Sequence, residues 1–265
     1  MKKIIRYFSL LLLVCFSFFY TDRVINLINK NDPLMKQLSS VSEEYRVNPV
    51  PAIIEDNTII PGIKGREIDI EKSYDKMKVA GVFRESALVY KDINPSSSLS
   101  NNKDKFVIKG NSIKNEVSIV LIVDSSNDID DLKGFNNLSL FLNSSYINST
   151  NIDKLKENEI YTYGKNGLYT DESLTSDSAI INNLSNNKSL YCLSKEKNSE
   201  TLKVCNERNM YVVIPNIVGD YSAIKKSLSK GSIILLNSIN NIDLVMKYIN
   251  GKGYEVVTLS KLLEE

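Results

Sequence analysis

Residues 231–265 read GSIILLNSINNIDLVMKYINGKGYEVVTLSKLLEE. The stretch opens with Gly-Ser and a short apolar run at 233–236, whose length and β-branched residues predict a buried strand. Asn237 follows at the carboxyl end of that strand, where sheets wound with helices place ligands and catalytic groups. The segment therefore predicts a strand with a polar residue at the position that a site would use.

A helix and a second strand complete this unit. Apolar residues recur at helical spacing at Ile242, Val245, Met246 and Ile249. Gly251 and Gly253 then act as helix-stop signals. Residues 254–259 are the next predicted strand, and Ser260 is in position to cap a last short helix over 261–265.

The same alternation runs through residues 105–265. Apolar runs predict strands at 106–108, 117–123, 138–142, 159–163, 189–193 and 210–214. Helical patterns lie between them at 152–157, 174–184, 200–209 and 221–228. Strands that alternate with helices favour parallel pairing, so the pattern predicts an α/β domain whose sheet closes into an irregular (β/α) barrel.

Composition limits the functions that need to be considered. The chain has 265 residues, 42% of them hydrophobic and 25% charged, which is enough for one substantial domain with appendages. Its formal net charge is +1, and it has no tryptophan and no basic stripe with interleaved aromatic residues. A nucleic-acid partner is therefore not expected.

The chain contains no histidine. No side chain therefore has an unperturbed pKa near neutrality, and nucleophile systems of the Ser-His-Asp or Cys-His type are excluded. A zinc site with histidine ligands is excluded for the same reason.

Three cysteines are present. Cys15 lies inside the N-terminal apolar run, which leaves Cys192 and Cys205 for the body of the chain. These two could pair in an oxidising compartment, or they could remain separate buried thiols.

Residues 1–21 combine a basic start with an apolar run at 7–20, and no Ala-x-Ala-like cleavage site follows. Counted from Ile4, the run nearly reaches the length of a membrane span, about 17–25 residues. We therefore expect an uncleaved signal-anchor in the cell membrane, with the N-terminus in the cytoplasm and the rest of the chain on the extracytoplasmic side. Secretion after signal cleavage is the alternative.

Three further regions precede the α/β domain. Residues 22–48 resemble a polar, partly helical stalk. Residues 49–95 combine short strand candidates, turn signals and one helical pattern, which predict a small α+β region. Residues 96–104 form a linker rich in Ser and Asn. The region at 49–95 is the candidate surface for a protein partner.

The closing unit resembles that of the polysaccharide deacetylase (NodB-homology) family. There the first strand ends in Leu-Leu-His, whereas here it ends in Leu235-Leu236-Asn237. The resemblance extends in order over residues 117–263. It implies a barrel whose relatives deacetylate polysaccharide with the help of a divalent metal.

The family's first two motifs supply the general base and the metal ligands. For the family's Thr-Phe-Asp-Asp-Gly this chain has IVDSS at 122–126, so the resemblance implies that Asp124 keeps the base position and Ser125 replaces a metal ligand. The family's two metal-binding histidines fall on Tyr163 and Gly167. Metal-assisted amide hydrolysis needs a cation that activates water and polarises the carbonyl. With these replacements we expect no metal, and no other cofactor.

The remaining motifs are also changed. The arginine that would orient the base corresponds to Tyr191, and the family's Asp-Trp is echoed by Asp220-Tyr221. The histidine that acts as the acid is Asn237. Four tyrosines are expected near the pocket mouth, where their rings could pack on sugars or fill vacated space: Tyr161, Tyr163, Tyr191 and Tyr221. The candidate binding residues are Tyr163, Tyr191, Asp220, Tyr221 and Asn237.

The sequence leaves three functions open. The first is a membrane-anchored, catalytically inactive deacetylase-like protein that binds cell-envelope polysaccharide or peptidoglycan. The second is an active carbohydrate deacetylase or hydrolase of non-peptide carbon–nitrogen bonds, with Asp124 as a general base rather than a leftover carboxylate that caps a loop. The third is a protein-binding scaffold, which an exposed apolar patch within 49–95 would favour.

Overall fold

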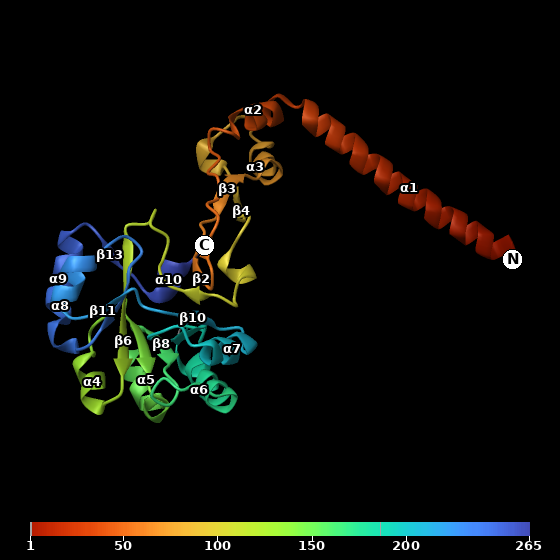
Figure 1. The fold of residues 1–265 in the computed structure, drawn as a ribbon. Coiled ribbons are helices and arrows are strands. Elements are labelled where there is room, and N and C mark those ends of the chain that lie inside the picture. Colours follow the sequence, from red (N-terminus) through yellow and green to blue (C-terminus); the bar gives the residue numbers. More distant parts are fainter. Residues whose placement is uncertain (1, 186) are drawn as a thin grey trace. The chain divides into compact units, whose positions relative to one another are not determined.

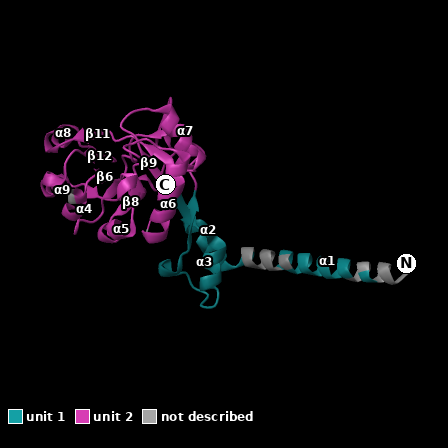
Figure 2. Cartoon of the chain, turned by 90° about the horizontal axis from the view of Figure 1, so that it is seen from below, with its two compact units in different colours: residues 1–49, 64–93 teal, residues 50–63, 94–265 magenta. Residues whose placement is uncertain are grey.

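The structure is a computed structural model that describes residues 2–185 and 187–265. Within them, only the backbone is described for 2–6, 8–10, 22, 25–30 and 127. The chain divides into two compact units, which are coloured separately in Figure 2. The smaller unit comprises Met1–Pro49 and Lys64–Ile93, and the larger comprises Val50–Ile63 and Asn94–Glu265.

The smaller unit consists of three helices and a hairpin: α1 (Lys2–Asn31), α2 (Pro33–Val41), β3 (Gly65–Ile68), α3 (Ile70–Met77) and β4 (Tyr90–Ile93). Asp32 caps α2 by accepting a 2.8 Å hydrogen bond from the Leu34 amide. Buried Leu34 and Leu38 of α2 pack with Tyr74 and Met77 of α3. This unit therefore has a small apolar core of its own.

The predicted membrane anchor at 1–21 falls on α1. Part of it lies outside the residues whose side chains are described, and residues 11–21 are all exposed. Among the described residues, no helix is both long and apolar enough to cross a membrane. The anchor therefore remains a prediction.

The main sheet of the larger unit is parallel throughout. Its strands have the order β11 (Ile217–Gly219), β12 (Ile233–Leu236), β6 (Glu116–Val123), β7 (Ser139–Leu142) and β8 (Glu159–Thr162), and β13 (Glu255–Val256) also pairs with β6. Figure 1 shows β6 as the long strand of this unit. Residues 117–121 of β6 are all buried, which explains why the apolar run has no polar alternation.

A second sheet has the order β1 (Ile53–Glu55), β2 (Thr58–Ile60), β5 (Phe106–Val107), β10 (Tyr211–Val213) and β9 (Tyr191–Leu193). β1 and β2 form an antiparallel hairpin, and the other pairings are parallel. Because β2 pairs with β5, residues 50–63 belong to the larger unit. The structure therefore divides the predicted α+β region at 49–95 between the two units.

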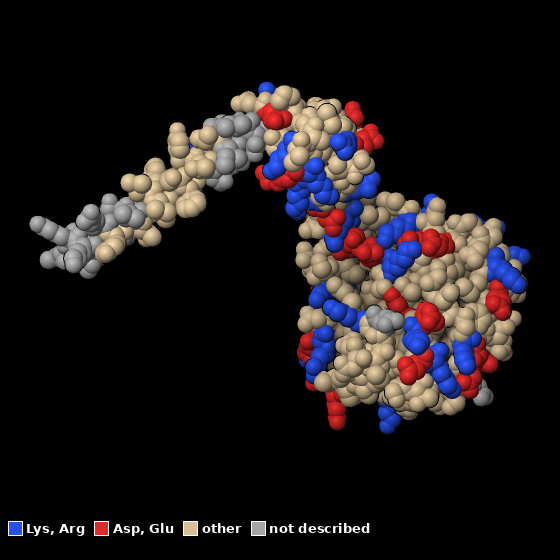
Figure 3. Space-filling model, turned by 180° about the vertical axis from the view of Figure 1, so that it is seen from behind, with Lys and Arg blue, Asp and Glu red and all other residues tan. Residues whose placement is uncertain are grey.

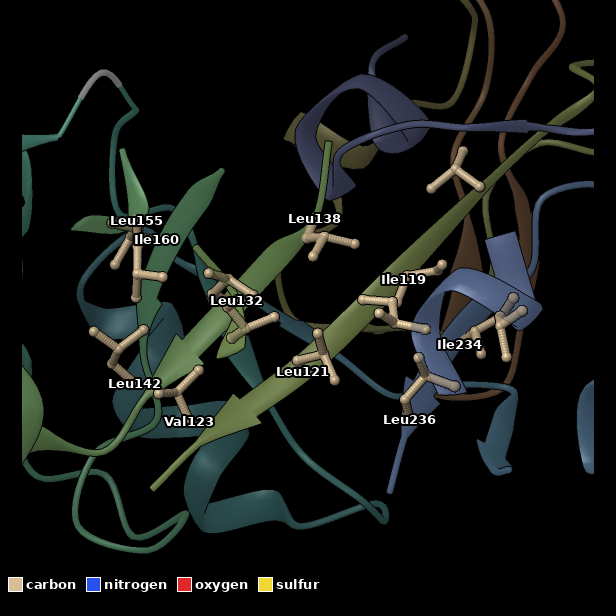
Figure 4. Close-up of a cluster of buried hydrophobic side chains, with 14 of the residues drawn as sticks. Ile119, Leu121, Val123, Leu132, Leu138, Leu142, Leu155, Ile160, Ile234 and Leu236 are labelled. Carbon is tan, nitrogen blue, oxygen red and sulfur yellow. The ribbon is translucent and has the colours of Figure 1, made fainter. Parts of the chain in front are cut away.

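Helices follow the strands of the larger unit: α4 (Ser126–Asp131), α5 (Ser149–Leu155), α6 (Asp171–Leu184), α7 (Ser199–Glu207), α8 (Tyr221–Ser227), α9 (Ile242–Gly251) and, after the last strand, α10 (Leu259–Leu263). Ile119, Leu121 and Val123 alternate along β6 and share a buried cluster with residues of α4, α5 and α9. Figure 4 shows these three side chains together with Leu155 of α5. Val120, on the other face of β6, belongs to a second buried cluster. Both faces of the central strand are thus covered.

The two sheets share this second cluster. Val120, Phe141 and Tyr161 come from the main sheet, whereas Val107 and Val213 come from the second sheet. In the part of the chain that the structure describes, no hydrogen-bonded ladder joins the sheets. The predicted α/β class with parallel strands is confirmed, but closure into an irregular barrel is not.

Asparagine side chains satisfy backbone groups at the sheet margins. The Asn187 side chain accepts a hydrogen bond from the Ile160 amide and donates one to its carbonyl, both at 2.9 Å. Asn216 accepts one from the Ile233 amide at 2.7 Å. The Ile160 backbone groups on the edge strand β8, and the Ile233 amide at the start of β12, are therefore satisfied by side chains.

Cys192 and Cys205 form a disulfide between β9 and α7, with their Cα atoms 6.5 Å apart. Both side chains are fully buried, beside Leu202 and Met210. Of the two possibilities that the sequence leaves open, the structure therefore has the paired cysteines.

Replacing Cys192 and Cys205 together by serine should lower the free energy of unfolding by about 3 kcal/mol, because the bridge closes a loop of about 15 residues. Urea denaturation measures this difference, and Cys15→Ser, which changes the exposed free cysteine, is the control. A thiol titration that finds every cysteine free in the unreduced, denatured chain would contradict the pairing.

Candidate functional site

The carboxyl ends of the parallel strands β6, β8 and β12 meet at one pocket. Asp124, Tyr163 and Asn237, which directly follow these strands, all line it. The pocket has a volume of about 560 Å³. Asn166 and Lys195 contribute further polar side chains to its wall. The structure thus brings three of the predicted site residues together.

A second pocket of about 520 Å³ adjoins the first, and the two share Asp124 and Asn166. Asn143, Ser144 and Lys165 line it on the other side. The Asp124 side chain is exposed and makes no hydrogen bond or ion pair with any residue that the structure describes. Its carboxylate is therefore available to a ligand in either pocket.

Ser125, at the family's metal position, serves α4 instead. Its hydroxyl oxygen accepts a hydrogen bond from the Asp128 amide at 3.2 Å and so caps the first turn of the helix. A serine hydroxyl that is engaged in this way is a poor ligand for a divalent cation. The structure thus gives Ser125 the role of a helix cap.

Tyr163 and Gly167 lie together in one tight turn. The Gly167 amide donates a 2.9 Å hydrogen bond to the Tyr163 carbonyl, so the two positions share a face of the turn. Gly167 has φ +82°, and a Cβ built there would lie 2.9 Å from the Tyr163 hydroxyl oxygen. The tyrosine thus takes up the space that a side chain at 167 would need. Burial raises the pKa of Tyr163, and the nearby charge of Asp124 raises it further.

A buried carboxylate holds the base of this turn. Asp177 of α6 accepts hydrogen bonds from the Ser144 hydroxyl at 2.6 Å and the Thr162 hydroxyl at 2.7 Å. Thr162 in turn accepts one from the Gly164 amide at 2.9 Å. The Asp177 side chain thereby joins α6 to the segment at Ser144 and to the end of β8 at Thr162.

The residues at this edge do not fit a divalent metal. Ser125 is engaged as a cap, Gly167 has no side chain, and the raised pKa of Tyr163 keeps its phenol neutral. In the described part of the chain, no group of three or more Asp, Glu, Cys or His side chains is placed to hold a metal ion. The chemistry that remains is that of three carboxylates (Asp124, Asp128 and Asp131), the Lys195 amine, amides, hydroxyls and an aromatic ring.

Four of the predicted residues lie away from both pockets. Tyr191 is only 5% exposed and packs in the shared core, with its ring centroid 5.3 Å from that of Tyr161. Tyr161 is also buried and donates a 2.7 Å hydrogen bond to Glu159. The expectation that these tyrosines flank the pocket mouth is therefore corrected: both rings belong to strand residues that point into the core.

Asp220 and Tyr221 instead begin α8. Asp220 accepts hydrogen bonds from the Ser222 hydroxyl at 2.7 Å and from the amides of Ser222 and Ala223, which hold its pKa below the usual range. Tyr221 packs edge-on against Tyr248. Their positions indicate a cap and a packing contact rather than a binding surface.

The pocket also contains residues that the sequence did not predict. Asn166, Lys195, Asp128 and Asp131 line it, and Asn143 lines the adjoining one. Asn143 directly follows β7, so the rule that places sites after strands could have found it. Asn166 has φ +56°, a conformation that asparagine tolerates, but nothing in the sequence marks it as a wall residue.

Comparison with known proteins supports the fold. No protein-family model matches the sequence. The uncharacterized protein YlxY of Bacillus subtilis is 39% identical over 98 residues, which is 37% of this chain. The match spans only 31% of that relative's length.

Solved structures match a much larger part of the chain. BA3943 of Bacillus anthracis, described as a CE4 family pseudoenzyme, has a TM-score of 0.62 at 20% identity, over 89% of this chain and 96% of that chain. A BA3943 mutant described as having restored enzymatic activity also scores 0.62, at 19% identity over 87% of this chain and 98% of that one. Bacillus subtilis PdaA, a family 4 carbohydrate esterase, scores 0.51 at 15% identity over 62% of this chain and 87% of its own.

These likenesses establish the class of fold. The chain has the α/β fold of the CE4 polysaccharide deacetylases, and it lacks every histidine of that family's motifs. The resemblance found in the sequence is thus confirmed at the level of the fold.

Replacing Asp177 by alanine should destabilise the protein by about 1–3 kcal/mol, because two hydroxyl donors lose a buried acceptor. Asp177→Asn keeps one carbonyl acceptor and should cost less. Urea denaturation compares both variants with Asp153→Ala, an exposed carboxylate on α5. Equal stability of Asp177→Ala and Asp153→Ala would refute the role of Asp177.

Proposed function

We propose that this protein is a deacetylase-like, catalytically inactive protein that binds cell-envelope polysaccharide or peptidoglycan. One observation carries the proposal: a pocket lies at the carboxyl ends of the parallel strands, and the residues that the sequence resemblance assigns to the metal positions, Ser125, Tyr163 and Gly167, do not fit a metal. Metal-assisted amide hydrolysis needs a cation that activates the attacking water and polarises the carbonyl of the substrate. The pocket is therefore kept while the means of cleavage is absent.

The pocket's size and lining support a glycan ligand. Its volume of about 560 Å³ lies within the range of about 300–1,000 Å³ that is usual for small-molecule sites. Tyr163 is half-buried and offers an aromatic ring, and Asn166, Asn237 and Asn240 offer amides that can pair with sugar hydroxyls. The adjoining pocket allows a second sugar to bind beyond Asp124.

The proposed location is the extracytoplasmic face of the cell membrane, with the N-terminal segment as the anchor. Residues 11–20 of α1 are apolar or aromatic apart from Ser17, and all of them are exposed. In the core of a soluble domain such side chains would be buried. The Cys192–Cys205 disulfide also favours an oxidising compartment. Secretion after signal cleavage would give the same compartment without the anchor.

A protein partner of the smaller unit is a second candidate function. Val79 is 93% exposed and Val82 is 53% exposed in the turn that follows α3. These two side chains are the contact that we propose for such a partner. Replacing both valines by serine should abolish binding to such a partner while leaving glycan binding unchanged.

The purified protein should contain no stoichiometric zinc, cobalt or nickel and should release no acetate from chitooligosaccharides or peptidoglycan. Elemental analysis and an acetate assay measure the two quantities, with a metal-dependent family 4 esterase as the positive control. Acetate release that is lost in Asp124→Asn would instead establish an active hydrolase with an atypical site.

Tyr163→Ala should weaken binding of a chitooligosaccharide about tenfold, or ~1.4 kcal/mol, because the ring no longer packs on the sugar. Tyr163→Phe should retain most of the affinity. Isothermal titration calorimetry measures both, with Tyr221→Ala as the control, since Tyr221 lines neither pocket. Loss of affinity in the control, with none in Tyr163→Ala, would place the binding site elsewhere.

A further inference from the structure

We propose that the pocket at Asp124 prefers deacetylated amino sugars, whose free amine is an ammonium ion, over the same sugars in N-acetylated form. This inference rests on the proposed function, because it names the glycan that the same pocket selects. On this account the protein binds the product of a deacetylase reaction rather than its substrate.

The charges of the pocket provide the first support. Asp124, Asp128 and Asp131 line it, and Lys195 is the one basic residue among its lining residues. None of these four side chains forms an ion pair with a residue that the structure describes. The remaining negative charge is therefore not neutralised within the protein, and it would attract a cationic ligand.

The position of Asp124 beside Tyr163 provides the second line of support for this preference. The carboxylate can accept a charge-assisted hydrogen bond from an ammonium group, which is stronger than a bond between neutral partners. The neighbouring Tyr163 ring can contribute a cation–π contact to the same group. Gly167 has no side chain and leaves room for the Tyr163 ring. The ring and the Asp124 carboxylate both line the pocket.

An N-acetyl group gains much less from the same surroundings. Its amide carries no charge for Asp124 to pair with. Its carbonyl finds no cation at Ser125, Tyr163 or Gly167, where a metal would polarise it in an active relative. The replacements that remove catalysis therefore also favour the amine over the amide.

Distribution of charge outside the pocket does not produce this preference. Figure 3 shows basic and acidic side chains intermixed over one face of the larger unit, and the whole chain has a formal net charge of +1. A cationic ligand would gain little from such a surface, because exposed charges are screened within about 10 Å at 0.1 M salt. The selectivity should therefore depend on Asp124 itself.

Calorimetry with the purified full-length chain tests the proposal, using the tetrasaccharide of glucosamine and that of N-acetylglucosamine at slightly acid pH. The glucosamine tetramer should bind about tenfold more tightly, as one charge-assisted hydrogen bond allows. Asp124→Asn should remove this preference, so that the ratio of the two affinities falls to about one. Asp153→Asn removes the same charge from a surface site that lines neither pocket, and should have no effect.

The outcomes separate this inference from the proposed function. Equal or tighter binding of the acetylated tetramer would overturn the inference and leave the glycan-binding function intact. A preference that survives in Asp124→Asn would also overturn it, because the charge would then act from elsewhere. If neither tetramer binds, the proposed function itself fails.

Discussion

The site depends on the parallel pairing of β6 with its neighbours. Register fixes Val120 opposite Leu235 and Val123 opposite Leu142, and β7 in turn aligns Leu142 with Thr162. Because all of these strands run in one direction, their carboxyl ends reach the same edge, and the residues that follow them meet there. The strand is buried on both faces, so shifting its register would displace two cores as well as the pocket.

At that edge, two of the residues that the sequence resemblance assigns to metal positions have local structural roles. Ser125 caps a helix, and Tyr163 occupies the space above a glycine that has no side chain and a left-handed backbone. Gly167→His would therefore meet the Tyr163 hydroxyl as well as an unfavourable φ of +82°. A metal ligand at position 167 would therefore require a change in the backbone of the turn and another in the Tyr163 ring. Asp124 is exposed and has no hydrogen-bond or ion-pair partner among the described residues, so a binding pocket can use its carboxylate without any catalytic partner.

Sequence reasoning located the features that depend on hydrophobic pattern. The strand predicted at 233–236 is β12, and its carboxyl end supplied Asn237, whereas Asp124 and Tyr163 came from the resemblance to the deacetylase motifs. It could not give the direction of a side chain at a particular strand position, and Tyr191 was therefore placed at the pocket although it lies in the core. Closure of the barrel was equally out of reach, because hydrophobic pattern does not show which groups pair with an edge strand such as β8, whose Ile160 amide is bound by the Asn187 side chain. At the C-terminus, α10 starts at Leu259, and Ser260 donates to the buried Glu159 instead of capping the helix.

A crystal structure of the protein grown with zinc and the glucosamine tetrasaccharide tests the central claim most directly. The account predicts sugar density against the Tyr163 ring, an amine within hydrogen-bond distance of Asp124, and no metal at this edge of the sheet. A zinc ion bound by Asp124 at about 2.0–2.2 Å, with the glycan positioned for attack by its water, would contradict it.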